Sequence, residues 1–526
     1  MYAHLRPENP PRRRRRWPWV AGVLVPVVAA AGTFWILRTT GSPEQVADAY
    51  LSAWSAGDYR AMRELVADPP ADFEQRHRQF SAAVKAERQT FHRITTGGVF
   101  AADGADTGEV SFGATLSGAV DWKYFGDLKF VERDRTWKID WTPATLHPSL
   151  TRDRTVRLVT ERVKGLEVQA ADGTRIDTPD APGSVQQLVA GLAQTYPDWF
   201  AERDSDRIEL VENGEVVKNL LDPPKWKPIR TTLDLKVHRA GADALEGVDK
   251  PASLVAVRAS TGEILAAVNK PGGFNRALLG KYPPGSTFKV VTASALVADG
   301  VRPDERVSCP AEQNIGGFPF HNAGFKDYGT LAFRDAFAHS CNTTFGAMVV
   351  GDLGAERLAE VAASFGFGAP IKPGVPAVKA DFPAPKDATD LASASIGQGR
   401  VLASPLNMAS VAAAVADGAW RPPRLVGADI APGDLRPRKL DADVVSALRT
   451  LMPAVVTEGT AHAVRFPGGT AGKTGTAEYG SGKEPPAHSW FIGYKDDLAF
   501  AVIVEGGGAG SAVAAPVAAR FLAELG

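Results

Sequence analysis

The chain has 526 residues, of which 44% are hydrophobic and 23% charged, a composition typical of a folded protein with several domains. Its 59 Lys and Arg residues balance 60 Asp and Glu residues, so the net charge of -1 argues against nucleic acid as a partner. Two cysteines are too few for a disulfide scaffold.

The start of the chain predicts a membrane anchor. Residues 1–16 end in a run of arginines and are predicted to form a cytoplasmic basic tail. Residues 17–37 contain no charged residue and would span about 31 Å as a helix, enough to cross a bilayer core of ~30 Å. A cleaved signal peptide ending near residues 29–31 is the alternative, but the apolar stretch continues through Leu37.

We therefore expect a single-pass protein of the cell membrane, with the chain that follows the anchor on the extracellular or periplasmic side. Cys309 and Cys341 would then face an oxidising compartment. Whether they pair stays open, because the sequence does not give their separation.

Residues 42–146 predict a small α+β domain. Ser42, Pro43 and Gln45 form a capping-box pattern at the start of an amphipathic helix that is expected to run to about residue 68. Between residues 91 and 141, short alternating stretches separated by Gly and Asp predict antiparallel strands. Residues 147–230, which include a predicted helix at 182–200, form a further segment.

Residues 231–526 predict the largest domain. A strand leading into a helix is expected at 231–245, and a two-stranded hairpin with its turn at Thr261 and Gly262 is expected at 252–270. Ala-rich helices follow, and the last clear strands begin near Lys473, Ser489 and Leu498.

Two polar residues open an apolar stretch, PGSTFKVVTASAL. Ser286 and Lys289 stand three apart, which places them on one face of a helix. A serine nucleophile needs a base within hydrogen-bond reach, and a lysine whose pKa is depressed by burial can act as one. An N-cap and a solvated lysine would give the same pattern.

Two further short patterns carry polar side chains. Ser340 and Asn342 flank Cys341 in AFAHSCNTTF, where one helix is expected to end and another to begin. Lys473, Thr474, Gly475 and Thr476 lie on a predicted strand, along whose edge an extended substrate could add as a further strand. The alternatives are a helix cap with a buried cysteine and a surface turn.

The three patterns S-x-x-K, S-x-N and K-T-G occur here in the order known for penicillin-binding proteins and serine β-lactamases. From about residue 231 to the C-terminus the chain resembles the transpeptidase domain of class B penicillin-binding proteins, which implies an antiparallel sheet flanked by helices. Residues 42–146 resemble the nuclear-transport-factor-like, cone-like domain found ahead of some of these enzymes, and 147–230 resemble a diverged pedestal of the dimerisation type.

The resemblance implies a peptidoglycan D,D-transpeptidase that β-lactams acylate, with neither metal nor cofactor. Ser286 would attack the D-Ala-D-Ala bond of a stem peptide, Lys289 would take its proton, and Ser340 with Lys473 would protonate the departing D-Ala. Asn342 would hold the peptide, Thr474, Gly475 and Thr476 would bind its carboxylate end, and the backbone N–H groups of Ser286 and Thr476 would form the oxyanion hole.

The expected partners are peptidoglycan stem peptides, β-lactam antibiotics, the membrane and a glycosyltransferase of the cell-wall synthesis machinery. Two alternatives stay open. A class D-like serine β-lactamase shares STFK and KTG, but it is much shorter and has an apolar residue in place of Asn342. A β-lactam sensor should have several spanning segments. His488 and Cys341 are interpreted as structural and packing residues.

Overall fold

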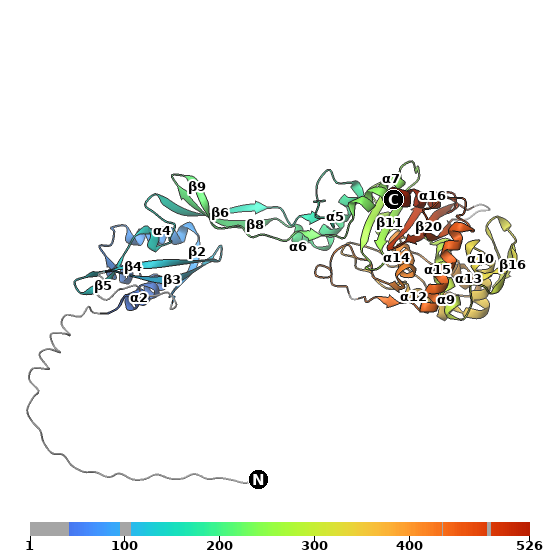
Figure 1. Cartoon of the computed structure of the whole chain (residues 1–526), viewed down its shortest axis with the longest axis horizontal. Coiled ribbons are helices and arrows are strands. Elements are labelled where there is room, and N and C mark those ends of the chain that lie inside the picture. The colour runs from blue at the N-terminus through green and yellow to red at the C-terminus, as the bar shows by residue number, and fades with distance from the viewer. Residues whose placement is uncertain (1–40, 95–106, 434, 481–484) are drawn as a thin grey trace, which may run out of the picture. The chain divides into compact units, whose positions relative to one another are not determined.

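The computed structural model describes residues 41–94, 107–433, 435–480 and 485–526 (Figure 1). These residues fall into two compact units. The first takes its described residues from 41–163 and 203–225, and the second from 164–202 and 226–526. The segment predicted as a pedestal, 147–230, is thus shared between the two units.

The predicted basic tail and anchor, residues 1–16 and 17–37, lie outside the described residues. Across the four described ranges, no helix combines the length and the apolar composition that a bilayer-spanning segment requires.

The first unit is an α+β unit. Its helices and helical turns are α2 (Pro43–Ala56), α3 (Tyr59–Glu64), α4 (Phe73–Ala83) and η1 (Pro143–Thr145). Its strands are β1 (Val66–Ala67), β2 (Ala86–Arg93), β3 (Thr107–Gly118), β4 (Trp122–Arg133), β5 (Thr136–Asp140), β6 (Arg154–Val163), β8 (Arg203–Glu212) and β9 (Glu215–Leu221). The strands form a five-stranded sheet of order β1-β5-β4-β3-β2 and a three-stranded sheet of order β6-β8-β9.

The predicted capping box is confirmed, because Ser42 and Gln45 cap α2 reciprocally. The single helix predicted to run to about residue 68 is wrong in its extent. Gly57 adopts a left-handed conformation with φ 72° and ends α2, and Asp58 then accepts a hydrogen bond from the Ala61 N–H and starts α3. Helical periodicity alone does not reveal such a break.

The core of the first unit is aromatic. Trp54 of α2 stacks on Phe91 of β2 with ring centroids 3.8 Å apart. The buried Tyr50 hydroxyl lies 3.1 Å from His77 Nε2, and burial lowers the pKa of His77 to about 4. Helices α2 and α4 thereby pack through large apolar rings onto the five-stranded sheet.

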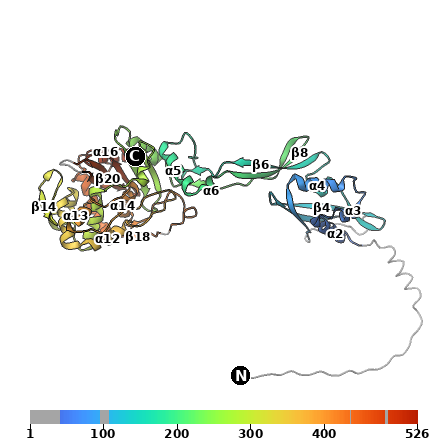
Figure 2. The same cartoon turned by 180° about the vertical axis from the view of Figure 1, so that it is seen from behind.

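The second unit carries the three motifs. Its helices and helical turns are α5 (Gly183–Thr195), α6 (Pro197–Phe200), α7 (Leu235–Ala244), α8 (Arg276–Leu279), η2 (Gly285–Phe288), α9 (Lys289–Ala298), η3 (Ala323–Phe325), α10 (Phe333–Ala338), α11 (Asn342–Met348), η4 (Val349–Leu353), α12 (Ala355–Ser364), α13 (Ala388–Ser395), α14 (Pro405–Asp417), α15 (Ala442–Thr457) and α16 (Ala514–Leu525). In the view from behind, α13 lies beside β14 (Glu312–Ile315) (Figure 2).

Its other strands are β7 (Val168–Gln169), β10 (Ile229–Arg230), β11 (Ala252–Arg258), β12 (Ile264–Lys270), β13 (Arg306–Cys309), β15 (Phe318–His321), β16 (Gly329–Ala332), β17 (Ala419–Trp420), β18 (Arg438–Lys439), β19 (Ala471–Glu478), β20 (Ala487–Lys495) and β21 (Leu498–Val504). The central sheet has the order β12-β11-β21-β20-β19, and all of its pairs are antiparallel. The predicted 252–270 hairpin and the three final strands are confirmed.

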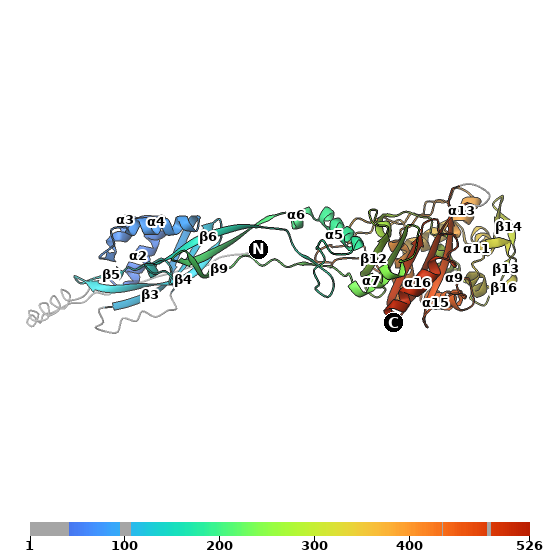
Figure 3. The ribbon, with the colours of Figure 1, turned by 90° about the horizontal axis from the view of Figure 1, so that it is seen from above.

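Helices cover both faces of this sheet. Helices α7 and α16 pack together on one face (Figure 3), where Phe521 of α16 contacts Phe500 of β21 with ring centroids 5.5 Å apart. On the other face, the Trp490 indole N–H of β20 donates to the Pro283 carbonyl at 3.1 Å. That bond holds the turn containing Ser286 against the sheet, next to the edge strand β19.

Candidate active site

Ser286 lies in the tight turn η2, directly before helix α9. The Thr287 hydroxyl donates to the Pro284 carbonyl at 2.7 Å and closes this turn. Gly285 has a φ of 54°, and an added Cβ there would lie 2.8 Å from the Thr476 carbonyl oxygen. A glycine at this position therefore lets the turn approach strand β19 closely.

Lys289 is fully buried one turn after Ser286. Its amine donates to the Ser340 carbonyl and to Asn342 Oδ1, both at 2.7 Å, and lies 3.3 Å from Ser340 Oγ. Burial, followed by the nearby Lys473 amine, lowers the pKa of Lys289 well below its usual value. Among the hydrogen bonds of the described residues, none joins Lys289 Nζ to Ser286 Oγ.

Lys473 reaches the same point from strand β19. Its buried amine donates to Ser340 Oγ at 2.8 Å and to the Thr474 carbonyl at 3.1 Å. Burial lowers the pKa of Lys473 to about 7. The Ser340 hydroxyl thus lies between two amines whose pKa values are both lowered by burial.

Ser340 has a φ of 62°, a left-handed conformation that is uncommon for a residue with a side chain. It lies between α10 and α11, where its N–H donates to the Phe337 carbonyl at 3.0 Å. Strained backbone of this kind is often found where a side chain must be aimed at a functional site. Here it allows Ser340 to meet both lysines.

The K-T-G residues lie on β19, the edge strand of the central sheet. The Thr474 hydroxyl pairs with the Thr460 hydroxyl at 2.6 Å, and the Thr476 hydroxyl accepts from the Gly510 N–H at 3.2 Å. The Thr476 carbonyl accepts from Gln398 Nε2 at 3.4 Å, so the main chain of Thr476 faces away from β20. Its N–H is directed to the open edge of the sheet.

These groups converge on one cavity of ≈ 470 Å³. Five of its lining residues are predicted site residues: Ser286, Ser340, Asn342, Thr474 and Thr476. Lys289 and Lys473 do not line the cavity themselves, but their amines donate hydrogen bonds to the lining residues Asn342 and Ser340. Gly475 is buried on the same strand between the two threonines.

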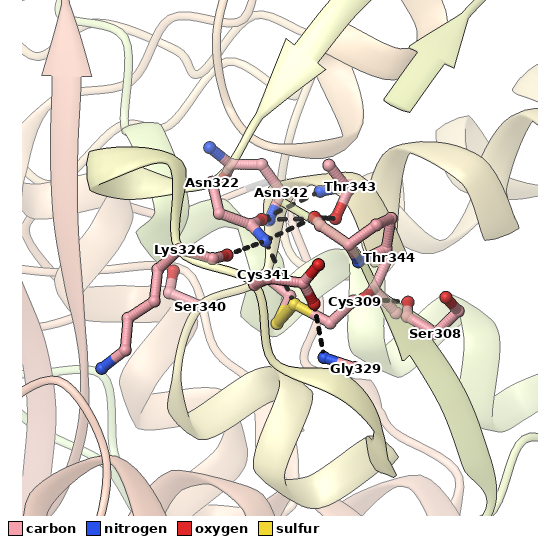
Figure 4. The surroundings of a disulfide bond; sticks show 12 residues. Ser308, Cys309, Asn322, Lys326, Gly329, Ser340, Cys341, Asn342, Thr343 and Thr344 are labelled. Carbon is pink, nitrogen blue, oxygen red and sulfur yellow. Dashed lines mark hydrogen bonds between the residues drawn. A yellow bond between two sulfur atoms is a disulfide. The ribbon is translucent and has the colours of Figure 1, made fainter. Parts of the chain in front are cut away.

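The two cysteines form a disulfide beside the site (Figure 4). The sequence predicts that Cys341 is a packing residue. It is fully buried, and it is also bonded to Cys309 on β13. The sequence left the pairing open, since only the fold brings β13 next to the start of α11. His488 fits its structural interpretation, because its ring stacks on Tyr479 with centroids 4.2 Å apart.

Three residues at the site were missed from the sequence: Thr460, Gln398 and Asn322. Thr460 contacts Thr474, and Gln398 contacts the Thr476 main chain. Gln398 lies in SIGQGRVLASPLNMA, a stretch that resembles the family, so a signal was present for it. Thr460 and Asn322 stand in loops where no spacing pattern marks them.

The arrangement can perform acyl transfer. A hydroxyl lies one helical turn from an amine that burial keeps from being permanently charged, which suits a nucleophile and its base. The Ser286 N–H lies at the start of a helix, and the Thr476 N–H faces the open edge of the sheet. Both N–H groups can therefore donate hydrogen bonds to a developing oxyanion. A second amine and hydroxyl can deliver a proton to a leaving group.

Comparison with known families matches both units. Residues 252–523 match the penicillin binding protein transpeptidase domain, and residues 42–154 match the NTF2-like N-terminal transpeptidase domain. The second match confirms the predicted nuclear-transport-factor-like domain, and both together support a multidomain α+β chain.

Among curated proteins, the peptidoglycan D,D-transpeptidase PbpA of Mycolicibacterium smegmatis is 33% identical over 368 residues, covering 57% of this chain and 72% of that protein. PbpA of Mycobacterium tuberculosis is 31% identical, covering 56% and 71%.

Among solved structures, penicillin-binding protein A from M. tuberculosis as a ceftriaxone acyl-enzyme complex has a TM-score of 0.52 at 29% identity, covering 58% of this chain and 81% of that chain. The D,D-transpeptidase domain of a peptidoglycan glycosyltransferase from Eggerthella lenta has a TM-score of 0.56 at 26% identity, covering 69% and 98%.

Proposed function

This chain belongs to the penicillin-binding protein transpeptidase family and is a peptidoglycan D,D-transpeptidase, and we propose that Ser286 is its nucleophile. The observation that carries the assignment is the meeting of Lys289 and Lys473 at the Ser340 hydroxyl, in the wall of the cavity that Ser286 lines.

In the first half-reaction, Ser286 Oγ attacks the carbonyl carbon between the two terminal D-alanines of a stem peptide. Neutral Lys289 takes the serine proton, and the Ser286 and Thr476 N–H groups stabilise the oxyanion, a contribution of about 3–4 kcal/mol for one such donor. The C–N bond then breaks, and the Ser340 hydroxyl, supplied with a proton by Lys473, protonates the departing D-Ala amine.

In the second half-reaction, the amine of a neighbouring stem peptide attacks the Ser286 ester. The amine gives up a proton through the Ser340 hydroxyl to Lys473, the C–O bond breaks, Ser286 regains its proton from Lys289, and a new peptide bond forms the cross-link. Lys289 and Lys473 thus exchange the roles they had in the first half-reaction: Lys289 now supplies a proton and Lys473 takes one up.

The substrate peptide is proposed to lie along β19. Thr474 and Thr476 place two hydroxyls at the cavity for the terminal carboxylate, with Gly475 between them. Asn342 Nδ2 donates one hydrogen to the His321 carbonyl at 2.9 Å. No hydrogen bond within the described part of the chain uses its second hydrogen, which is proposed to donate to a peptide carbonyl.

We further propose that the chain is anchored in the cell membrane by residues 17–37, with its catalytic unit outside the cytoplasm. A glycosyltransferase is proposed as a partner, because cross-linking needs freshly polymerised strands. The similarity to a transpeptidase domain of a peptidoglycan glycosyltransferase supports this pairing of activities. Fractionation of cells that express the full chain tests the anchor, and co-purification from membranes tests the partner.

The nucleophile is tested by intact-mass measurement on the full-length chain with and without benzylpenicillin. We expect one long-lived adduct on the unaltered protein and none on Ser286→Ala, as acyl-enzyme complexes of a similar protein suggest. Rapid turnover of the drug without an adduct would instead indicate a β-lactamase. The absence of both adduct and turnover would contradict the assignment of Ser286.

A further inference from the structure

A buried asparagine outside the three motifs lies against the start of α11 (Figure 4). Asn322 follows strand β15 and is 2% exposed. Its Oδ1 accepts hydrogen bonds from the Asn342 N–H at 2.8 Å, from the Thr343 N–H at 3.3 Å and from the Thr343 hydroxyl at 3.3 Å. One side-chain oxygen therefore receives the first two N–H groups of the helix.

These contacts make Asn322 the cap of α11, although it is far from the helix in sequence. The first N–H groups of a helix have no acceptor within the helix and need one from elsewhere. The N-cap position itself is Cys341, whose sulfur is bonded to Cys309. A distant asparagine thus performs the function that Ser, Thr, Asp or Asn usually performs from the N-cap.

The orientation of the Asn322 amide is determined by its partners. Its Nδ2 donates to the Pro310 carbonyl at 2.8 Å and to the Lys326 carbonyl at 3.0 Å, and it lies 3.2 Å from Cys309 Sγ. Carbonyls need donors and N–H groups need an acceptor, so only one of the two amide orientations satisfies all of these groups. The Asn322 amide is therefore held in one orientation.

The capped residue is the one that holds the proposed base. Asn342 Oδ1 accepts from Lys289 Nζ at 2.7 Å, and Asn342 Nδ2 donates to the carbonyl of His321, the neighbour of Asn322. The main chain and the side chain of Asn342 are therefore both held by residues 321 and 322. The disulfide holds the adjacent Cys341 from β13.

We propose that Asn322 is a positioning residue for the transpeptidase reaction: it fixes Asn342, and through the Asn342 amide it places the Lys289 amine relative to Ser340 and Ser286. This inference rests on the proposed roles of Ser286 and Lys289. Loss of the cap frees the start of α11 and changes the acceptors around Lys289, which slows proton transfer from Ser286.

A matched control lies on the same helix. Thr344 is also 2% exposed, and its hydroxyl donates to the Ser308 carbonyl at 2.7 Å, which joins α11 to β13. Thr344→Val removes a buried hydrogen bond from this contact without removing a partner of Asn342. Asn322→Asp keeps an oxygen for the two N–H groups, whereas Asn322→Ala removes it.

The test is the second-order rate constant for acylation by benzylpenicillin, measured by intact mass on the full-length chain from about pH 6 to about pH 9. The groups that face Lys289 are Ser340, the Asn342 amide, the Phe345 ring and the Lys473 amine. Thermal midpoints are measured on the same samples, so that loss of fold is separated from loss of reactivity.

We expect Asn322→Ala to lower the rate constant at least about tenfold. The acid limb of its pH–rate profile, where the rate constant falls as the pH is lowered, should move to lower pH. The reason is that the Lys289 amine loses an acceptor that favours its charged form. Asn322→Asp should recover part of the rate, and Thr344→Val should keep the rate and the limb of the unaltered chain while lowering the thermal midpoint.

An Asn322→Ala protein with the same rate and the same acid limb as Thr344→Val would overturn the inference. If Asn322→Ala does not fold, Asn322→Asp decides: a reduced rate supports the role, and an unaltered rate overturns it. Failure of the proposed function is distinguishable, because the unaltered chain would then form no adduct at Ser286. An adduct on the unaltered chain with no effect of either Asn322 variant contradicts this inference alone.

Discussion

At the scale of single residues, the active site keeps two lysines in an environment that disfavours their charge. Lys289 and Lys473 are both fully buried, and burial is the largest cause of the lowered pKa of each. Burial favours the neutral form of an amine, which can take up a proton, but folding then has to remove from water a group that is charged in the unfolded chain. The burial that suits these two lysines to the proposed proton transfers therefore lowers the free energy of unfolding.

This loss of stability predicts the effect of Lys473→Met. The pKa of Lys473 is about 7 in the folded protein, below the ordinary value of 10.5. Between these two pH values the unfolded chain carries the proton and the folded chain does not, so the free energy of unfolding rises with pH, by at most about 1.4 kcal/mol per pH unit. Below about pH 7 both states are protonated and this gain is absent.

We expect Lys473→Met to lose acylation by benzylpenicillin while remaining folded, with a thermal midpoint at pH 7 no lower than that of the unaltered chain. Its midpoint should depend less on pH between about 7 and about 10. Thermal unfolding at several pH values measures this slope. The exposed Lys439→Met is the control and should leave the slope unchanged; an equal slope in both variants would contradict the prediction.

At the scale of elements, the site depends on close approach between a turn and an edge strand. Turn η2 brings the Ser286 N–H to β19, where the Thr476 main chain faces the open edge of the sheet. The Gly285 N–H donates to the Gly397 carbonyl at 2.8 Å, and this bond holds the turn to the loop after α13. The spacing of the two proposed oxyanion donors thus depends on how tightly these elements pack.

Gly285→Ala should widen that spacing. The new methyl group would lie 2.8 Å from the Thr476 carbonyl oxygen, at a backbone φ of 54° that disfavours a side chain. We expect the acylation rate constant to fall at least about tenfold, since loss of one oxyanion donor costs ~10²–10³ in rate.

Stopped-flow measurement with a fluorescent penicillin reports this rate. Gly272→Ala in the same unit adds a methyl group that meets no atom within 4 Å, and it should react as the unaltered chain does. Equal rates for the two variants would show that the approach of η2 to β19 does not limit acylation.

At the scale of the whole molecule, two separate hydrophobic cores support the chain. One core is built from residues of the first unit and includes Trp54, Phe112 and Ile208. The other is built from residues of the second unit and includes Phe288, Trp490 and Phe521. Strands β6 and β8, at residues 154–163 and 203–212, belong to the first unit, although the chain between them, 164–202, packs with the second.

Two cores predict two unfolding transitions. Differential scanning calorimetry of the full-length chain should resolve them, because each unit buries its own apolar residues. Acylation by benzylpenicillin at Ser286 should shift only the transition of the second unit, which contains the site. One transition that shifts as a whole would show that the units unfold cooperatively.

Local patterns in the sequence predicted several elements correctly. Short-range patterns, which depend on neighbours a few residues apart, can be recognised without knowledge of the tertiary fold. They predicted the capping box at Ser42, the 252–270 hairpin and strands β19, β20 and β21. The break at Gly57 was missed, because the helical pattern continues on both sides of it.

The sequence by itself predicted the chemistry, since three short motifs in a known order name the hydroxyl, the amines and the amide that are proposed to carry out acyl transfer. Only the tertiary structure decided where they meet. Ser340 between two buried amines, the Thr460 and Asn322 contacts and the Cys309–Cys341 bond all join residues far apart along the chain. Such contacts depend on how whole elements pack, and burial, which sets the pKa of each lysine, exists only after that packing.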